Sequence, residues 1–370
     1  MRKYIRREFI EAHPDLYEKI MSDDYKFLDE NESLKNKIIL LGLGGSHAYG
    51  TSTPDSDLDI RGICFNSKKE LLGLSNFSIF VDKDTDTTIY SLGKMFELLM
   101  DCNPNIIEIL GLNNEDYLYL SPEGEKLLEN KEMFLSQKAY YTFSGYAYSQ
   151  FKRLQNATAR DSLSEEEREG HILHSVEKQI EQLQQKFDKS LGTVQLHIGD
   201  AVSEGHNKEI LMNGTFENYP LRAFNQLYNA MNQVCKDYDK LDHRNKKKDD
   251  KHLNKHASHL IRLYQMAFDI LEKHEIVTHR PEEDLNLLRD IRAGKYMENS
   301  IMNAEFYKMV DDMNERLEEV KKHTTLRSRV DRDECEKLLI ELNESGMRKE
   351  EAREMIEGIG VGRDEEEIIL

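Results

Sequence analysis

The hydrophobic pattern of the first 130 residues predicts four short strands. Residues 37–43 form an apolar run that ends in glycines, which is typical of a buried strand. Residues 58–65 predict a second strand, and residues 78–81 predict a weaker one. Residues 87–91 are β-branched and aromatic, which favours a further strand. Together these segments predict a short mixed sheet.

Apolar residues at helical spacing dominate the rest of the chain. Residues 15–28 precede the first strand, a helix is expected from Leu92, and another is expected to begin near Pro104 or Asn105. After about residue 130 strand signals nearly vanish. Six later segments have the helical period: residues 143–154, 165–191, 221–238, 253–274, 282–293 and 304–322.

These patterns predict an α+β protein of four parts. We expect an N-terminal helical extension (1–35), a small α/β domain with a short mixed sheet (36–130), a larger all-helical domain (131–325) and an acidic helical tail (326–370). A chain of 370 residues can bury one large core or two ordinary ones. The charge run at 243–251 predicts a solvated loop.

The charge balance weakens the case for an indiscriminate nucleic-acid binder. The formal net charge is −19, whereas affinity for phosphates requires a positive face. A local basic patch could still hold a nucleic-acid substrate. A small molecule or a protein as substrate fits this charge at least as well.

Cysteine spacing and hydropathy predict a cytoplasmic protein. The cysteines Cys64, Cys102, Cys235 and Cys335 lie far apart, so we expect unpaired thiols and no disulfide-linked partner. No run approaches the roughly 18 apolar residues of a membrane span. Apolar residues typical of a secretory signal do not follow the basic N-terminus.

The most informative segment is residues 44–62, GGSHAYGTSTPDSDLDIRG. A strand that ends in Gly-Gly-Ser leaves the backbone at Gly45 open to anionic oxygens, and the Ser46 hydroxyl can donate to a phosphate. Asp57 and Asp59 are two residues apart, so on a strand they point the same way and can share hard cations such as Mg²⁺. Two such ions can bridge phosphates and neutralise a departing pyrophosphate. The segment therefore predicts nucleotidyl transfer.

A third carboxylate is needed to complete the site of a catalytic metal. Asp84 and Asp86 both precede the strand predicted at 87–91. Asp86 is nearer to that strand and is favoured, but Asp84 stays open at this stage.

Other charged residues near the motif are expected to have structural roles. Asp55 and Asp82 are expected to serve turns. Arg61 is expected to face away from the aspartates and to form a salt bridge rather than bind a ligand.

A helix near residue 255 offers a second group of polar side chains. Lys255, His259 and Arg262 are spaced i, i+4 and i+7, so they line one helix face. This face is either a cationic ridge that closes over the nucleotide's phosphates or an ordinary solvated face. A zinc site is not favoured, because the sequence offers no further ligand at compatible spacing.

Aromatic residues leave two more alternatives open. His47 and Tyr49 either touch the nucleotide or fill the seam between the turn and the following helix. A base could stack on a group of four tyrosines, Tyr140, Tyr141, Tyr146 and Tyr148. A role in helix packing is favoured for them.

The string Gly-Ser-His-Ala-Tyr-Gly-Thr-x-Thr-Pro-x-Ser-Asp-x-Asp-x-Arg-Gly resembles the DNA polymerase beta-like nucleotidyltransferase superfamily. Within it, the string is similar to the RNA ligase-associated predicted nucleotidyltransferases. Residues 86–110, 255–263 and 288–296 resemble later segments of that branch, and the whole resemblance covers roughly residues 25 to 300.

The resemblance implies a role for each motif residue. Gly45 and Ser46 would bind the triphosphate, and Asp57, Asp59 and Asp86 would hold two Mg²⁺ ions, or Mn²⁺ in their place. Asp86 would also be the base towards the acceptor. The resemblance raises the interpretation of Lys255, His259 and Arg262 as nucleotide-binding residues to equal standing with that of a solvated face. It also implies that the small α/β domain is the nucleotidyltransferase domain.

These expectations combine into one predicted function. The chain is expected to be a Mg²⁺-dependent nucleotidyltransferase that moves NMP from an NTP to a hydroxyl or phosphate acceptor and releases pyrophosphate. The acceptor could be an RNA end, a small molecule or a protein. The alternative is a catalytically idle NTP-binding regulatory module, which the intact Asp-x-Asp motif disfavours.

Overall fold

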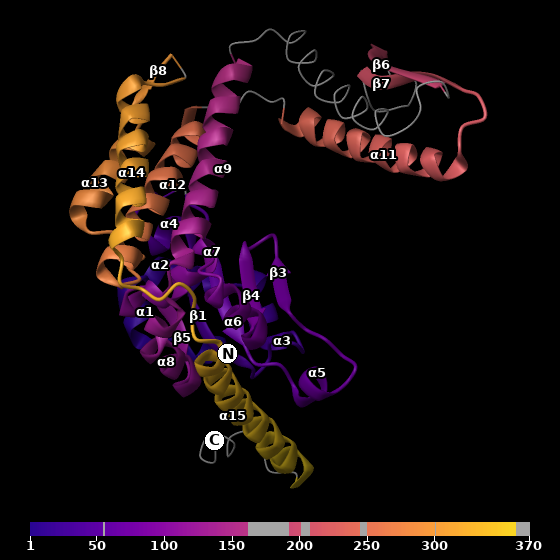
Figure 1. The fold of residues 1–370 in the computed structure, drawn as a ribbon. Helices are drawn as coiled ribbons and strands as arrows, with labels where there is room; N and C mark the ends of the chain where they lie inside the picture. The colour runs from indigo at the N-terminus through magenta and orange to yellow at the C-terminus, as the bar shows by residue number, and fades with distance from the viewer. Residues whose placement is uncertain (55, 162–191, 201–207, 245–249, 300, 360–370) are drawn as a thin grey trace. The chain divides into compact units, whose positions relative to one another are not determined.

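The computed structural model of this chain describes residues 1–54, 56–161, 192–200, 208–244, 250–299 and 301–359 (Figure 1). The chain folds into two compact units. The first contains residues 1–151, 254–298 and 302–370, and the second contains residues 152–253 and 299–301. The α+β class predicted from the sequence is confirmed.

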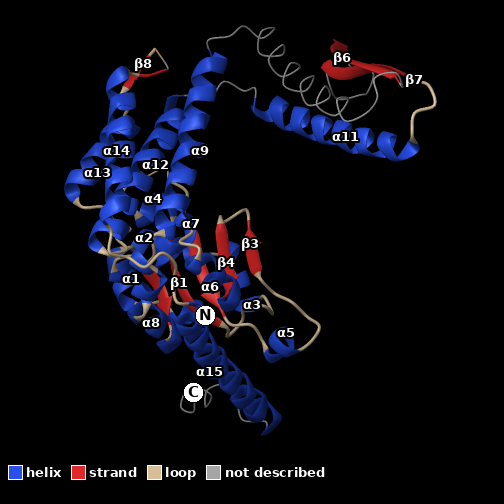
Figure 2. Ribbon diagram, in the orientation of Figure 1, coloured by secondary structure: helices blue, strands red, loops and turns tan. Residues whose placement is uncertain are grey.

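A mixed sheet of five strands forms in the first unit (Figure 2). The strands lie in the order β3-β4-β2-β1-β5, with β2 and β4 parallel and the other neighbours antiparallel. They are β1 (Ile38–Leu43), β2 (Ile60–Cys64), β3 (Ile79–Asp82), β4 (Thr87–Ser91) and β5 (Tyr117–Leu120). The apolar runs predict the first four. Strand β5 is not predicted from the sequence, because it is only four residues long and lies between an acidic turn and a Ser-Pro helix start.

Helices complete the first unit. Those that lie within it are α1 (Arg7–Ala12), α2 (Pro14–Ile20), α3 (Phe27–Glu30), α4 (Gly45–Ala48), α5 (Lys68–Leu72), α6 (Leu92–Met100), α7 (Pro104–Ile107), α8 (Pro122–Glu129), α13 (Glu282–Arg292), α14 (Ala304–His323) and α15 (Arg332–Ile359). Two more contain residues of both units, α9 (Lys138–Asp161) and α12 (Asp250–Phe268), and a π-helical turn, Asp269–Lys273, follows α12. None of the described helices is long and apolar enough to cross a membrane.

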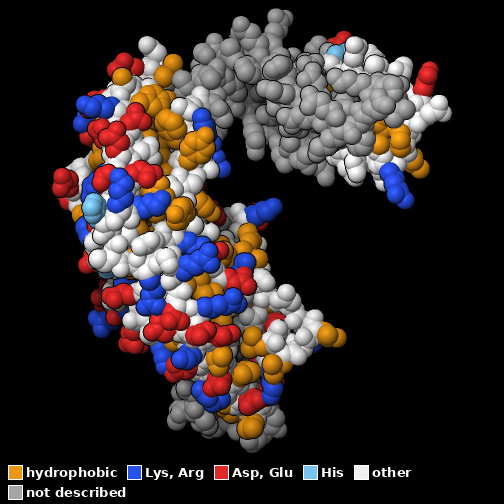
Figure 3. All heavy atoms as spheres, viewed as in Figure 1, with side chains coloured by type: hydrophobic (Ala, Val, Ile, Leu, Met, Phe, Trp, Pro, Cys, Tyr) orange, Lys and Arg blue, Asp and Glu red, His pale blue; other side chains and the backbone are white. Residues whose placement is uncertain are grey.

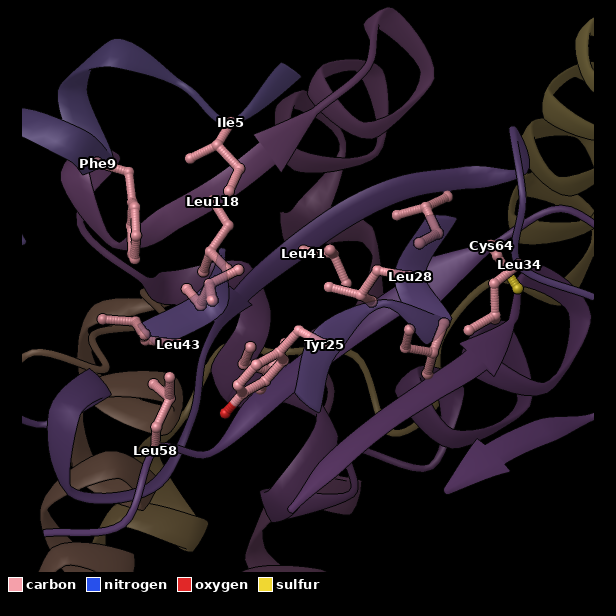
Figure 4. Close-up of a cluster of buried hydrophobic side chains, with 14 residues drawn as sticks. Ile5, Phe9, Tyr25, Leu28, Leu34, Leu41, Leu43, Leu58, Cys64 and Leu118 are labelled. Carbon is pink, nitrogen blue, oxygen red and sulfur yellow. The ribbon is translucent and has the colours of Figure 1, made fainter. Parts of the chain in front are cut away.

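The chain that precedes β1 covers one face of the sheet (Figure 4). Apolar side chains of this segment and of the strands form a single buried cluster, and burial of such area is the main stabilising contribution in folding. The cluster consists of Ile5, Phe9, Ile20, Tyr25, Leu28, Leu34, Ile38, Leu41, Leu43, Leu58, Ile60, Cys64, Ile89 and Leu118. The N-terminal residues are therefore part of the core of this unit.

The opposite face of the sheet carries polar residues near the strand starts. Arg61 and Ile63 of β2 pair with Thr88 and Tyr90 of β4, and paired residues on neighbouring strands point to the same side. The other face of β4, which bears Ile89, is buried, whereas Thr88 and Tyr90 are half-buried. Arg61, at the start of β2, places this face beside the candidate site.

The acidic C-terminal segment packs against this unit through α15. Its Gly346 lies so close to the Phe65 ring that an added Cβ would be 2.8 Å from the ring. The Arg353 guanidinium donates to the Asn36 carbonyl at 2.6 Å, and Lys68 pairs with Glu351 at 2.6 Å. The predicted helix in this segment is confirmed over residues 332–359.

A buried carboxylate on α8 joins α15 to the sheet. Glu123 accepts hydrogen bonds from Ser121, Ser345 and Lys349. Burial by itself would raise the pKa of Glu123, but these hydrogen bonds outweigh it and lower the pKa. A carboxylate with a lowered pKa in the folded state stabilises the fold above its unfolded pKa, and this contribution is lost as the pH falls below about 4.

We expect Glu123→Ala to lower the free energy of unfolding by about 1–3 kcal/mol, because it leaves the half-buried Ser345 and Lys349 groups without their acceptor. Urea denaturation at pH 7 measures the change. The matched control is Glu125→Ala, an exposed acidic residue on the same helix, which should shift stability by less than about 0.5 kcal/mol. Equal effects of the two substitutions would contradict this role of Glu123.

The second unit contains a β-hairpin, so the expectation of an all-helical domain over residues 131–325 is wrong in this part. Strands β6 (Gly192–Asp200) and β7 (Lys208–Phe216) are antiparallel, and Val194, Leu196 and Ile210 are partly buried on one face of the hairpin. Apolar and polar residues alternate in β6, which is a strand signal within the segment predicted to be helical. A second small ladder is formed by β8 (Met297–Glu298) and β9 (Ile301–Met302).

The remaining helical predictions are confirmed where the structure describes them. They correspond to α9, α12, α13, α14 and α11 (Leu221–Arg244), while the helix predicted over 165–191 lies outside the described residues. At the charge run α11 continues to Arg244 and α12 begins at Asp250, so helix extends into both ends of the predicted loop. Cys64, Cys102 and Cys335 are buried free thiols.

Candidate active site

The Gly-Ser turn directly follows β1 and is packed against Asp59. The Gly44 amide donates to the Asp59 carbonyl at 2.8 Å. Gly45 has a φ of +55°, and an added Cβ would lie 2.7 Å from the carboxyl carbon of Asp59 and closer still to Oδ2. Only glycine meets both demands without strain. The turn, with Ser46 next in the chain, is therefore fixed relative to this carboxylate.

Two carboxylates from neighbouring strands meet beside this turn. Asp59 precedes β2, Asp86 precedes β4, and the two side chains interact directly. Burial, followed by the hydrogen bond with Asp86, raises the pKa of Asp59 to about 7. The same hydrogen bond is the main cause that lowers the pKa of Asp86. Without a cation, one acid of the pair therefore holds its proton more readily than an isolated aspartate does, which is the behaviour of like charges held close together.

Asp86, rather than Asp84, is the acid that lies beside Asp59. Asp86 adopts a φ of +45°, a left-handed conformation that aspartate tolerates better than most residues. Asp84 is exposed in the turn between β3 and β4. In the same turn Asp82 accepts from the Thr85 amide and hydroxyl at 2.9 Å, which is the turn role predicted for it. Asp55, for which a turn role was also predicted, lies outside the described residues.

Arg61 joins the carboxylate pair, so the expectation that it faces away from the aspartates is wrong. Its Nη1 donates to the Asp86 carbonyl at 2.6 Å, and its Nη2 lies 3.4 Å from Oδ1 of Asp86 and 3.7 Å from Oδ1 of Asp59. Residues 59 and 61 are two apart and so share a side of an extended chain. The predicted salt-bridge role is correct.

Asp57 lies two residues before Asp59 in an extended segment that leads into β2. The strand begins at Ile60 rather than at Leu58, so both aspartates precede it. Leu58 is buried, whereas Asp57 is exposed. No group of three or more His, Cys, Asp or Glu side chains among the described residues is close enough to hold a metal by itself. The carboxylates that the structure brings together are Asp59 and Asp86.

Helix α12 contributes positive charge to this site. Lys255 is exposed and forms no ion pair with a described residue, and its charge lowers the pKa of both Asp59 and Asp86. The Arg262 guanidinium lies 3.4 Å from the centre of the Tyr49 ring, and its Nη2 is 2.9 Å from Nδ1 of His259. The side of α12 that is near the turn and the carboxylates thus carries Lys255, His259 and Arg262.

Tyr49 fills the seam between the turn and α12, one of the two alternatives left open for it. The side chain is buried, and its hydroxyl has no hydrogen-bond partner among the described residues. Arg262 stacks on it, and the Arg262 Nε is likewise buried without a partner in the described part of the chain. Burial lowers the pKa of Arg262 to about 10, and the nearby Glu108 carboxylate opposes this change. Cation–π stacking therefore joins the turn to the helix.

Two arginines of α13, which are not among the predicted site residues, contact the same turn. Arg292 donates to the Thr51 carbonyl at 2.6 Å, and Arg289 lies 3.5 Å from the Gly50 carbonyl. Gly50 has a φ of +75° and packs against the His279 ring. The α13 segment resembles the nucleotidyltransferase branch, but only the fold reveals that it contacts the turn, because nearly 240 residues separate them.

Comparison with known proteins identifies a matching family and one similar relative. A model of the family described as "RlaP: RNA repair pathway DNA polymerase beta family" matches residues 20–195. An uncharacterized 38.9 kDa protein from the nrdC-mobD intergenic region of Enterobacteria phage T4 is 31% identical over 86 residues, which cover 20% of this chain and 25% of the phage protein. The chain therefore matches about a quarter of the length of this curated relative. No solved structure matches the chain.

Proposed function

Residues 20–195 belong to the RNA repair pathway DNA polymerase beta family, and on this premise we propose that the protein is a Mg²⁺-dependent nucleotidyltransferase. It would transfer NMP from an NTP to a hydroxyl or phosphate acceptor and release pyrophosphate. The observation that carries the proposal is the Asp59–Asp86 carboxylate pair beside the glycine turn at Gly45. A phosphate cradle next to two facing acids is suited to this chemistry.

The carboxylate pair fits Mg²⁺ ions that arrive with a nucleotide. Mg²⁺ in proteins is usually bound by one or two carboxylates together with substrate phosphates, so three protein ligands are not required. Asp59 and Asp86 would be the principal ligands, with the exposed Asp57 available as a further one. When bound, the ions would withdraw charge from the phosphates and from the acceptor oxygen.

The protein's own groups account for the remaining steps. The backbone of Gly45 and the hydroxyl of Ser46 would hold the triphosphate. The acceptor oxygen attacks the α-phosphorus, a new P–O bond forms, and the bond from phosphorus to the bridging oxygen breaks, so that pyrophosphate leaves. For a hydroxyl acceptor the proton passes to the Asp86 carboxylate and from there to water. Lys255 and Arg262 would oppose the negative charge that gathers on the phosphates.

Labelled-nucleotide transfer tests this proposal. The purified chain is incubated with Mg²⁺ and each α-³²P-labelled NTP, together with RNA oligonucleotides, a small-molecule extract or a protein extract. We expect label in one acceptor fraction and an equal amount of pyrophosphate. Because a proton on Asp59 competes with the cation, the Mg²⁺ concentration that gives half-maximal activity should rise as the pH falls below about 7. Tight NTP binding without pyrophosphate release from any fraction would instead indicate an idle regulatory module.

A further inference from the structure

Four strand ends meet along one edge of the sheet at the candidate site. Leu43 at the end of β1 pairs with Ile60 at the start of β2, which pairs with Thr87 at the start of β4, and Thr87 pairs with Asp82 at the end of β3. Neighbouring strands are about 4.8 Å apart. The glycine turn, Asp59, Asp86 and β3 therefore follow one another in this order along the edge.

This order separates the two sides of the proposed reaction. In an in-line displacement the attacking and leaving oxygens lie on opposite sides of the phosphorus. If the pyrophosphate leaves towards the turn after β1, the acceptor approaches from the side of β4 and β3, where Asp86 lies. This step rests on the proposed function.

The face of β4 and β3 on that side is aromatic and apolar. Tyr90 is half-buried on the same face as Arg61, and opposite it on β3 lies Ile79, which is 47% exposed. Val81, opposite Thr88, is 52% exposed. Tyr90 is four residues from Asp86, roughly 13 Å along the strand.

Tyr146 of α9 borders this face. Its hydroxyl accepts a hydrogen bond from the Asn103 amide at 3.5 Å. Burial raises the pKa of Tyr90, and the nearby Tyr146 hydroxyl adds to this rise. Asn103 is itself fixed, because its side-chain oxygen caps α7 by accepting from the Asn105 amide at 3.1 Å. Tyr140 and Tyr141 contact each other instead. Their two rings pack edge to face, and the Lys321 ammonium lies over both.

We propose that Tyr90, Tyr146, Ile79 and Val81 form a nucleobase site for the end of a single-stranded nucleic-acid acceptor. Tyrosine rings stack on any base through its flat face, and such stacking is how proteins bind unpaired strands with little sequence preference. Lys83, exposed in the turn directly after β3, would meet a backbone phosphate of such a strand. On the face of this unit that Figure 3 shows, acidic and basic side chains are interspersed, which suits a short contact with a strand end.

A single tryptophan reports directly on this site, because the chain contains none. In Tyr90→Trp we expect indole fluorescence to be quenched when a single-stranded RNA oligonucleotide is added with Mg²⁺. The matched control is Leu74→Trp, at a fully exposed position in the loop before β3, where quenching should be absent. Quenching by Mg·NTP alone, with none from the oligonucleotide, would assign the site to the donor base and overturn the proposal.

Two further substitutions keep the test independent of the tryptophan variant. Val81→Glu places a charge on an exposed position of the face, and Tyr146→Ala removes a ring. Each should weaken oligonucleotide binding at least tenfold, measured by fluorescence anisotropy, and leave the Kd for Mg·NTP unchanged. Leu74→Glu should change neither.

The outcomes separate this inference from the proposed function. Oligonucleotide binding that depends on Val81 and Tyr146 but yields no transfer would contradict only the nucleotidyltransferase activity. Transfer that is indifferent to both substitutions, or transfer to a protein or small molecule alone, would overturn only the nucleobase site.

Discussion

The variant Asp59→Asn will lose nucleotidyl transfer, with pyrophosphate release lowered at least about 1000-fold. Asparagine keeps the shape that Gly45 packs against, so the turn remains in place. What is lost is the negative charge that we propose holds Mg²⁺ together with Asp86. The rate of pyrophosphate release with saturating Mg·NTP and acceptor measures the effect. The matched control is Asp84→Asn in the β3–β4 turn, where an exposed acid is neutralised and activity should be retained.

Asp59→Asn should make the folded protein more stable, although it lowers activity. Burial raises the pKa of Asp59 to about 7, so in the folded state its charged form is disfavoured relative to the unfolded chain. For an acid with a raised pKa, stability falls as the pH rises from about 4 to 7. Without added Mg²⁺ at pH 8, Asp59→Asn should therefore raise the free energy of unfolding, by about 1–3 kcal/mol.

Transfer that survives in Asp59→Asn, or in the double variant Asp57→Ala with Asp59→Ala, would contradict the proposed mechanism.

An inactive but more stable variant would identify the carboxylate pair as a functional feature. Two acids that face each other weaken the fold unless a cation joins them. Arg61 relieves part of this repulsion, since it contacts both Asp59 and Asp86. The exposed Lys255 adds positive charge from α12.

Local sequence signals predicted the sheet side of this site well. The run at 37–43, the β-branched segment at 87–91 and the helix start at Leu92 depend on neighbouring residues only, and each corresponds to an element of the structure. The preference for Asp86 over Asp84 followed from its distance to a strand. The alternation of side chains along a strand also predicts Arg61 beside Asp59, because residues two apart point to the same side.

Contacts between distant segments could not be predicted in this way. Arg262 was identified as part of a polar helix face, but its stacking on Tyr49 depends on how α12 packs in the first unit. The contacts of Arg289 and Arg292 with the turn depend on the fold to the same degree. Strand β5 is short and gains its partner only from β1. Hydrophobic periodicity contains no information on such pairings.

The second large effect is expected from Gly45→Ala, which should lower kcat/KM at least about 100-fold. The methyl group would lie 2.7 Å from the Asp59 carboxyl carbon, so the carboxylate or the turn must move. A shift of about 1 Å in a catalytic group is enough for a loss of this size. The φ of +55° adds a backbone cost of about 1–2 kcal/mol for alanine. Steady-state kinetics and thermal unfolding measure the two effects.

The matched control is Gly93→Ala in α6, where an added Cβ meets nothing within 4 Å. It should leave activity unchanged and raise stability by about 0.5–1 kcal/mol, because alanine is the better helix former. If both alanine variants lose activity alike, the loss at Gly45 cannot be attributed to the contact with Asp59.

A double-mutant cycle tests whether Gly45 acts through Asp59. Because transfer is almost absent in Asp59→Asn, the cycle is measured on the Kd for Mg·NTP. If Gly45→Ala weakens binding by displacing the Asp59 carboxylate, it should cost much less in the Asp59→Asn background, and the two effects should be strongly non-additive. Additive effects would mean that Gly45 serves the triphosphate through its own backbone, since loss of the carboxylate would then leave its contribution unchanged.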